Sequence, residues 1–153
     1  MGTVRLQAMF NDFSEILLKL AKKAEKNGEI PIACIAVVNG KIIAKAHNLV
    51  EKRQNKMAHA EMIVIEKLRK KFKTTHFFDM KISLYITLEP CCMCLSAISM
   101  CGIESVFYML EDKKTGGIER IYTEHSSYHK PNLFLVQSKK YEKLLLKFFQ
   151  YLR

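Results

Sequence analysis

Two short segments of the sequence carry side chains that bind metal ions and transfer protons. One is HAE at residues 59–61, and the other, about thirty residues later, is PCCMC at residues 90–94. Structural zinc sites use four protein ligands, whereas catalytic sites use three and leave the fourth position to water. His59, Cys91 and Cys94 supply one imidazole and two thiolates, so they are the predicted ligands of a catalytic zinc ion.

Glu61 is the carboxylate that this ligand set leaves free. It lies two residues after His59, and residues two apart on a helix do not face each other, so the two side chains are not expected to bind one metal side by side. A catalytic zinc ion generates a nucleophile from water, and a nearby carboxylate takes and returns the proton. The pattern therefore predicts hydrolytic removal of an exocyclic amine from a ring carbon.

Two other interpretations use the same cysteines. The CxxC pair could join His125 and His129 in a four-ligand zinc module, but these halves stand about thirty residues apart, beyond zinc-finger spacing. That module would also leave the HAE segment unexplained. Alternatively, Cys91 and Cys94 could form a thioredoxin-like redox pair, against which zinc in the purified protein would argue.

The number and spacing of the cysteines indicate a reducing compartment, and two of the cysteines that are not predicted ligands are expected to pack in the core. Five cysteines are an odd number, and their adjacent and CxxC spacing does not suit a disulfide framework, so we expect a cytoplasmic protein. Cys34 and Cys101 lie among apolar residues, as free core cysteines do. Cys92 could face the pocket or pack against the sheet.

The longest apolar stretch is too short to cross a membrane, so no membrane partner is expected.

Composition predicts one globular domain with a basic surface. The 153 residues are 49% hydrophobic and 26% charged, which excludes disordered and fibrous classes. We expect residues 1–153 to form a single zinc-dependent deaminase domain. The formal net charge of +10 makes polyanions plausible partners, although a generally basic, solvated surface would give the same charge.

Hydrophobic periodicity predicts alternating helices and strands. The expected helices cover residues 10–24, 58–71, 90–101 and 139–153, and the expected strands 32–38, 41–46, 82–88, 103–110 and 133–137. Asn39-Gly40 is a strong signal for a type I′ hairpin. A polar loop is expected at residues 48–57 and a long loop, with room for a short helix, at residues 111–131. Pro90 is expected to start its helix.

This order of elements predicts an α/β protein. Strands that alternate with helices pair in parallel, and the leading hairpin adds an antiparallel edge. We expect a three-layer α/β/α sandwich with a mixed five-stranded sheet. Both ligand segments then fall in the opening turns of helices, where the helix dipole and free N–H groups favour thiolates.

Five segments, read in order, resemble a known family. GEIPIACIAVV, AHN, HAE, TLEPCCMC and KTGG resemble the bacterial tRNA-specific adenosine deaminases across nearly the whole chain, within the cytidine deaminase-like superfamily. The resemblance implies a cytidine deaminase-like fold with one zinc ion per subunit and Glu61 as proton shuttle. It also implies conversion of adenosine to inosine at the wobble position of a tRNA anticodon, by a homodimer that binds the anticodon loop across its interface.

The resemblance also implies pocket residues. Asn48 matches the asparagine that holds the flipped adenine, and Glu29 and Ile30 match positions at the pocket mouth. The backbone of Ala60 and Cys91 is expected near the reacting water. A deaminase of free guanine or cytosine would share every metal residue, and a non-enzymatic zinc module is a third class.

The C-terminal helix is the expected RNA-binding element of the family. Its candidate residues are Phe148, Phe149, Lys147 and Arg153. The two phenylalanines could stack on bases or pack the helix onto the core. Ala33, Leu49 and Gln150 depart from the family pattern, in which Gly, Arg and Arg are common.

Overall fold

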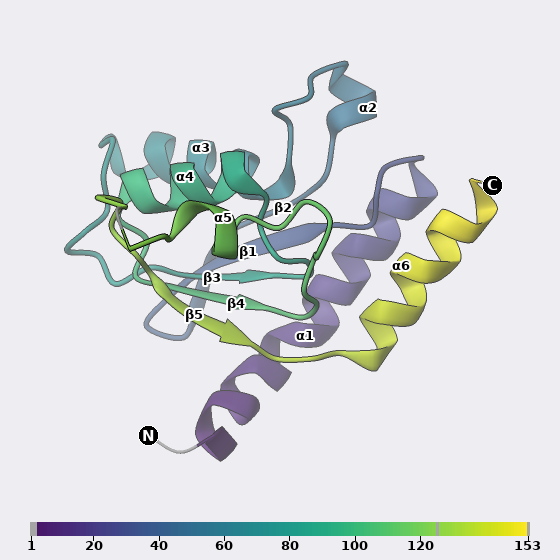
Figure 1. Ribbon diagram of the computed structural model, residues 1–153, viewed down its shortest axis with the longest axis horizontal. Helices are drawn as coiled ribbons and strands as arrows, with labels where there is room; N and C mark the ends of the chain where they lie inside the picture. Colours follow the sequence, from purple (N-terminus) through teal and green to yellow (C-terminus); the bar gives the residue numbers. More distant parts are fainter. Residues whose placement is uncertain (1–2, 125, 153) are drawn as a thin grey trace.

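The computed structural model describes residues 3–124 and 126–152 and contains a mixed five-stranded sheet between two layers of helices (Figure 1). The elements in chain order are α1 (Thr3–Lys26), β1 (Ala33–Val38), β2 (Lys41–His47), α2 (Val50–Arg53), α3 (Ala60–Phe72), β3 (Ser83–Ile86), α4 (Cys92–Cys101), β4 (Ser105–Tyr108), α5 (Ile118–Ile121), β5 (Asn132–Leu135) and α6 (Lys139–Tyr151). This arrangement confirms the predicted fold class.

The sheet combines an antiparallel hairpin with parallel strands. Its strand order is β2-β1-β3-β4-β5, in which β1 pairs antiparallel with both neighbours and β3, β4 and β5 are parallel. Asn39 and Gly40 have φ values of 49° and 75°, as a type I′ turn requires. The hairpin register shifts between Ala36 and Val37, which marks a bulge.

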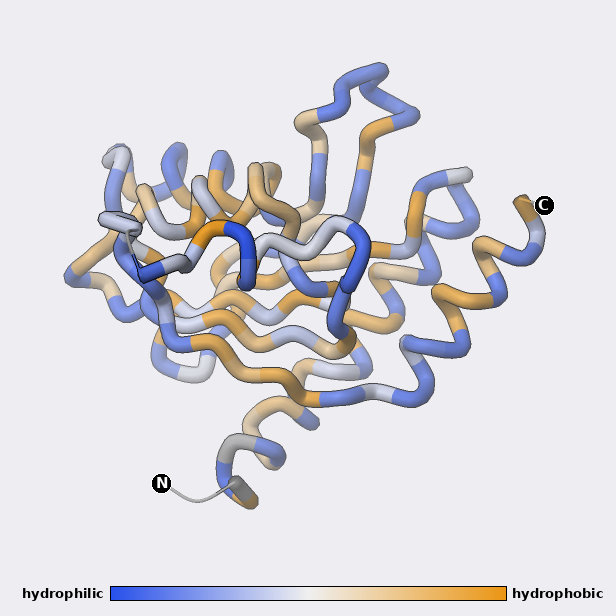
Figure 2. The backbone as a smooth tube through the Cα atoms, viewed as in Figure 1, coloured by the Kyte–Doolittle hydropathy of each residue, from blue (hydrophilic) through white to orange (hydrophobic). Residues whose placement is uncertain are grey.

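Alternate strand residues point to two separate cores. Cys34 and Ala36 of β1 face α3 and α4, whereas Ala33, Ile35 and Val37 face α1 and α6. Tyr85 and Phe107 stack in the second core with ring centroids 4.6 Å apart. Figure 2 shows apolar positions gathered along the central strands and polar positions on the α2 region and other outer loops.

The structure corrects two expectations for the segments beside the ligands. The expected polar loop at 48–57 contains the short helix α2, which projects from the body of the molecule (Figure 1). Pro90 does not start the second ligand helix, because α4 begins at Cys92 with Cys91 as its N-cap. Cys91 is extended there and forms an isolated bridge with Gly116, so the helix starts after it.

Several other expected elements are shorter or shifted, and one is present as expected. β3, β4 and β5 span four residues each, and the predicted short helix in the long loop is α5. Within the described residues, no helix combines the length and the apolar character that crossing a membrane requires.

Two glycines after helices allow a matched test of what holds the α4 terminus. Gly28 and Gly102 both have left-handed φ, at 75° and 76°, but a Cβ at Gly28 would meet no atom within 4 Å. A Cβ at Gly102 would lie 2.5 Å from Cγ of Phe78, because that ring covers the glycine.

We expect Gly28→Ala to lower the free energy of unfolding by about 1 to 2 kcal/mol, the cost of left-handed backbone for a residue with a Cβ. Gly102→Ala is expected to cost more, because the Phe78 ring must also move. In a Phe78→Ala background this excess should disappear. Urea unfolding of the variants measures the difference, and equal effects of the two glycine substitutions in the natural background would contradict the steric explanation.

Candidate active site

The three predicted metal ligands converge on one point. The ligand atoms of His59, Cys91 and Cys94 all lie within 4.8 Å of one another. Nδ1 of His59 is 3.7 Å from Sγ of Cys91 and 3.4 Å from Sγ of Cys94. The imidazole therefore presents Nδ1 to both sulfurs, a detail that the sequence did not determine.

This convergence follows from where two helices begin. His59 is the N-cap of α3 and Cys91 is the N-cap of α4, and both residues are extended. An N-cap side chain commonly accepts a hydrogen bond from the first turn, but neither of these side chains does so. Cys94 follows in the first turn of α4 and is fully buried. The side chains are thus free to face one another.

The two sulfurs behave as a coupled pair. A hydrogen bond from the Cys94 thiol is the main cause that lowers the pKa of Cys91 to about 4, and the imidazole of His59 contributes. The same sulfur contact, followed by burial, raises the pKa of Cys94. The pair thus shares one proton between two soft donors beside an imidazole. A zinc ion in place of that proton would ionise both sulfurs, so the donor set fits this metal.

Glu61 lies beside the three ligands but is not one of them. Its side chain is 4% exposed, and its Oε2 has no hydrogen-bond partner in the described part of the chain. Burial raises the pKa of this carboxyl group. An unpaired oxygen on a buried carboxylate is costly unless a ligand or water pairs with it, so its position indicates a role in chemistry.

The described residues do not support the four-ligand zinc module in which the CxxC cysteines would join His125 and His129. His59 joins the cysteines, whereas His129 packs against the Phe78 ring with centroids 5.4 Å apart. His125 lies outside the described residues. Cys91 and Cys94 are free cysteines, and the approach of the imidazole to both sulfurs favours a metal site over a redox pair.

The ligands open into a cleft of about 1220 Å³. Its walls come from the α1–β1 connection, the α2 segment, the ends of β3 and β4, and α6. Among its lining residues are Glu29, Ile30, Asn48, Lys56, His59, Glu61, Cys91, Lys113, Lys114, Phe148 and Phe149. The cleft therefore gathers most of the predicted site residues.

Asn48 is held by its backbone and offers its side chain to this cleft. Its N–H donates to the Ile32 carbonyl at 2.9 Å, and its own carbonyl lies 2.9 Å from Nδ1 of His47. The side chain is 4% exposed, and Oδ1 has no hydrogen-bond partner within the described residues. A buried, unpaired amide oxygen at this place can accept a hydrogen bond from a bound base.

Glu29 and Ile30 lie at the same wall in different environments. Glu29 is fully buried, and its carboxylate accepts hydrogen bonds from the N–H groups of Glu51 at 2.7 Å and Lys52 at 3.1 Å. It therefore caps the first turn of α2, a use that sequence reasoning missed. Ile30 is 36% exposed and lines the cleft. Ala60 is buried as the first residue of α3.

The C-terminal helix forms the far wall. Phe148 and Phe149 line the cleft and contact each other edge to face, at 5.5 Å between centroids. Lys147 lies over the Tyr151 ring instead of among the lining residues. Arg153 lies outside the described residues.

Three lysines that the sequence did not single out also line the cleft. Lys56 follows α2, and Lys113 and Lys114 precede α5. The doubled lysine directly before the TGG of the KTGG segment was the available signal. Leu49, which stands where Arg is common in the family, packs against the α3 core.

Comparison with known proteins gives the family. The cytidine and deoxycytidylate deaminase zinc-binding region matches residues 9–110. The tRNA-specific adenosine deaminase of Aquifex aeolicus is 36% identical over 144 residues, which cover 92% of this chain and 94% of that protein. The chain belongs to the tRNA-specific adenosine deaminases of this zinc deaminase family. The predicted resemblance is thereby confirmed.

Two solved structures share this fold, and one of them also has substantial sequence identity to this chain. A tRNA:A34 deaminase, studied for A-to-I editing at the wobble position, is similar with a TM-score of 0.76 and 31% identity, over 82% of this chain and 97% of that one. A guanine deaminase from Nitrosomonas europaea has a TM-score of 0.74 but 18% identity, over 93% and 83% of the chains. The second likeness shows a shared fold alone.

Substitution of single cysteines tests the ligand set of this deaminase family member. Cys91→Ser and Cys94→Ser should each lose most bound zinc, because a serine hydroxyl is a poor replacement for a thiolate. Cys92→Ser is the matched control and should keep zinc, because Cys92 lies outside the converging group. Metal content by elemental analysis of the purified variants measures this. Loss of zinc from the Cys92 variant alone would overturn the assignment.

Proposed function

We propose that this protein hydrolytically deaminates adenosine to inosine at the wobble position of a tRNA anticodon. One observation carries the proposal: a buried carboxylate, Glu61, keeps an unpaired oxygen beside a three-ligand metal cluster inside a large cleft. The family supports tRNA as substrate, because its curated and structurally characterised members include tRNA-specific adenosine deaminases.

The size and lining of the cleft support a polynucleotide over a free base. Small-molecule sites commonly measure about 300 to 1,000 Å³, whereas this cleft measures about 1220 Å³. Three lysines and two phenylalanines line it, together with acidic residues such as Glu51 and Glu111. Lysines pair with phosphates and aromatic rings stack on bases, so the outer cleft suits nucleotides that flank the reacting one.

The residues of this chain divide the work of the reaction. His59, Cys91 and Cys94 would hold zinc, which supplies Lewis acidity that makes water a nucleophile near neutral pH. Glu61 takes a proton from the attacking water and delivers it to N1 of adenine, and then transfers a second proton to the leaving nitrogen. Asn48 orients the base through its unpaired amide oxygen.

The reaction balances with water as its only co-reactant. A C–O bond forms at C6 of adenine and the C6–N6 bond breaks. The exocyclic nitrogen leaves as ammonia, and the ring keeps the oxygen as the carbonyl of inosine. Glu61 ends in its starting protonation state, so it serves each turnover without an added acid or base.

We extend the proposal to the assembly and its setting. One zinc ion per chain follows from the single three-ligand group found within the described residues. A homodimer that binds the anticodon loop across its interface is part of the proposal, as the resemblance to the tRNA-specific adenosine deaminases implies. The tRNA substrate and free cysteines support a cytoplasmic location.

Replacement of Glu61 by Gln tests the proton shuttle. The amide keeps the size of the side chain but cannot take a proton, so we expect turnover to fall by about 10²- to 10⁴-fold. Zinc should remain bound, because Glu61 is not among the three ligands. Glu66→Gln, on the exposed face of the same helix, is the control and should keep full activity. Deamination by the Glu61 variant at the unaltered rate would remove Glu61 from the mechanism.

A substrate comparison tests the proposed reaction itself. The zinc-loaded protein is incubated with tRNA that carries adenosine at the wobble position, and separately with free adenine, guanine and cytosine. We expect inosine and ammonia from the tRNA and none from the free bases. A tRNA with guanosine at the wobble position is the control. Ammonia from a free base together with unreacted tRNA would instead favour a free-base deaminase.

A further inference from the structure

We propose that Glu89 is a positioning residue that fixes residues 112–118 as a wall of the cleft and so sets the affinity for RNA. The inference rests on the proposed function for its substrate, but the contacts that carry it do not. Glu89 follows β3 and precedes the ligand Cys91 by two residues, and its side chain is half-buried.

The carboxylate of Glu89 joins both ends of this wall. Its Oε2 accepts a hydrogen bond from the Asp112 N–H at 2.9 Å, and its Oε1 accepts one from the Ile118 N–H at 3.2 Å. The Glu89 N–H donates to the Leu110 carbonyl at 2.8 Å, which ties the start of the wall to the same residue. Hydrogen bonds to an ionised acceptor are stronger than those between neutral groups. One side chain thus fixes a seven-residue turn at two points.

Two glycines let the wall approach the ligand segment this closely. A Cβ at Gly116 would lie 2.3 Å from Oε1 of Glu89 and 2.4 Å from the Asp112 carbonyl oxygen. A Cβ at Gly117 would lie 2.9 Å from the Cys92 nitrogen, and the Gly117 N–H donates to the Pro90 carbonyl at 2.8 Å. The glycines of the KTGG segment are therefore required by close packing against residues 89–92.

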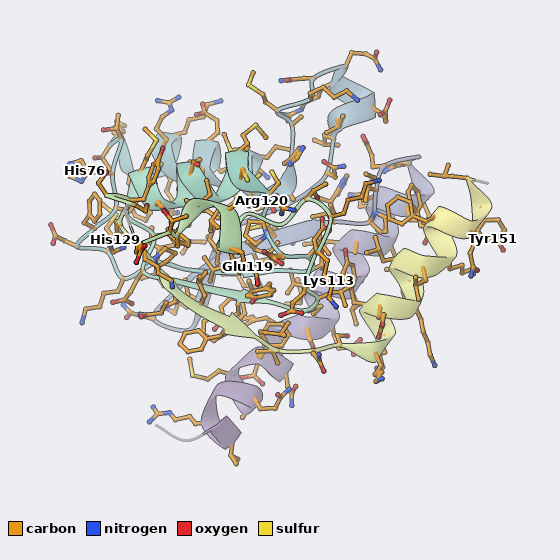
Figure 3. The ribbon with its side chains drawn as sticks, in the orientation of Figure 1. His76, Lys113, Glu119, Arg120, His129 and Tyr151 are labelled. Carbon is orange, nitrogen blue, oxygen red and sulfur yellow. The ribbon has the colours of Figure 1, made fainter. Side chains whose placement is uncertain are left out.

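The wall is internally stiff. Oδ1 of Asp112 accepts hydrogen bonds from the N–H groups of Lys114 and Thr115, both at 3.0 Å. The Arg120 guanidinium donates to the carbonyls of Lys113 at 3.3 Å and Lys114 at 3.0 Å, and to that of Gly116. Figure 3 shows Lys113 on this turn and Arg120 on α5, the helix that follows it. Because the turn is one unit, its contacts with residues 89–92 decide where its residues lie, and the two hydrogen bonds to the Glu89 carboxylate hold its two ends.

The placement of this unit matters for binding because it carries part of the cleft surface. Lys113, Lys114 and Thr115 line the cleft and are exposed. Two ammonium groups and a hydroxyl at a fixed place match the phosphates and sugar hydroxyls of an RNA strand. A turn freed from Glu89 would present the same groups over many positions, and binding would then have to order them.

The test is Glu89→Gln, which keeps the shape of the side chain but places an NH₂ donor opposite a backbone N–H. In the zinc-loaded protein without substrate, we expect amide hydrogen exchange at Asp112 and Ile118 to accelerate. With tRNA we expect KM to rise about tenfold, the loss of one such hydrogen bond, with kcat and zinc content unchanged. Glu119→Gln, an exposed carboxylate on the neighbouring α5, should change none of these quantities.

Gly116→Ala provides a second route to the same contact, because its new Cβ would lie too close to the Glu89 carboxylate and would displace it. We expect it also to raise KM, and the effect of the double variant to be smaller than the sum of the two single effects, because both disturb the Glu89 contact while the new Cβ also displaces the Asp112 carbonyl. Thermal unfolding monitors the fold of each variant. Additive effects would contradict a shared contact.

We call the contact between the Glu89 carboxylate and residues 112–118 the clamp. The outcomes of these experiments separate the clamp from the proposed reaction. Unchanged amide exchange in Glu89→Gln would overturn the clamp. Faster exchange with unchanged KM would overturn its role in RNA affinity. Loss of zinc and of kcat with KM unchanged would show that Glu89 acts through Cys91 instead. Unaltered protein that leaves tRNA unreacted would contradict the proposed function but not the clamp, which the exchange rates decide.

Discussion

The site depends on two helix N-termini that face each other across one strand. β2 leads through a short segment into α3, and β3 leads into α4; in the sheet, these two strands flank β1. Both helices pack on the same face of the sheet, so His59 and Cys91 meet above β1 as N-cap residues. Each helix adds the positive end of its dipole. The backbone therefore creates a local potential that favours thiolates before any metal contributes.

Among the described residues, two of the three buried side-chain polar atoms without a partner lie at this site, and the third, the Tyr141 hydroxyl, lies in the second core. Oε2 of Glu61 and Oδ1 of Asn48 are both enclosed and unpaired within the described residues. An unsatisfied buried group costs about 1 to 3 kcal/mol, and a protein keeps such groups where a ligand completes them. Two other acidic groups at the cleft, Glu29 and Glu89, have both oxygens paired with backbone amides. The contrast separates groups that meet the substrate from groups that hold the walls.

Sequence analysis located the ligands but not the supports of the cleft. His59, Cys91 and Cys94 were predictable because residue types and short spacing encode a donor set, and Asn39-Gly40 was predictable because its turn is local. The role of Glu29 was not, since it depends on which amides α2 leaves free, and α2 is a four-residue helix in a polar segment. Glu89 was missed for the same reason, because its partners lie more than twenty residues later. Its glycine neighbours mark that contact only once the distances are known.

Two walls of the cleft, the α2 segment and residues 112–118, are each fastened by a carboxylate that accepts from main-chain N–H groups. Every residue type except proline provides such a donor, so the fastening itself does not depend on which side chains occupy α2 or the exposed positions 113–115. Those side chains are consequently free to diverge without loosening the architecture. A lineage of such enzymes could adapt to new anticodon sequences by single substitutions along the rim, while the metal and its surroundings stay the same.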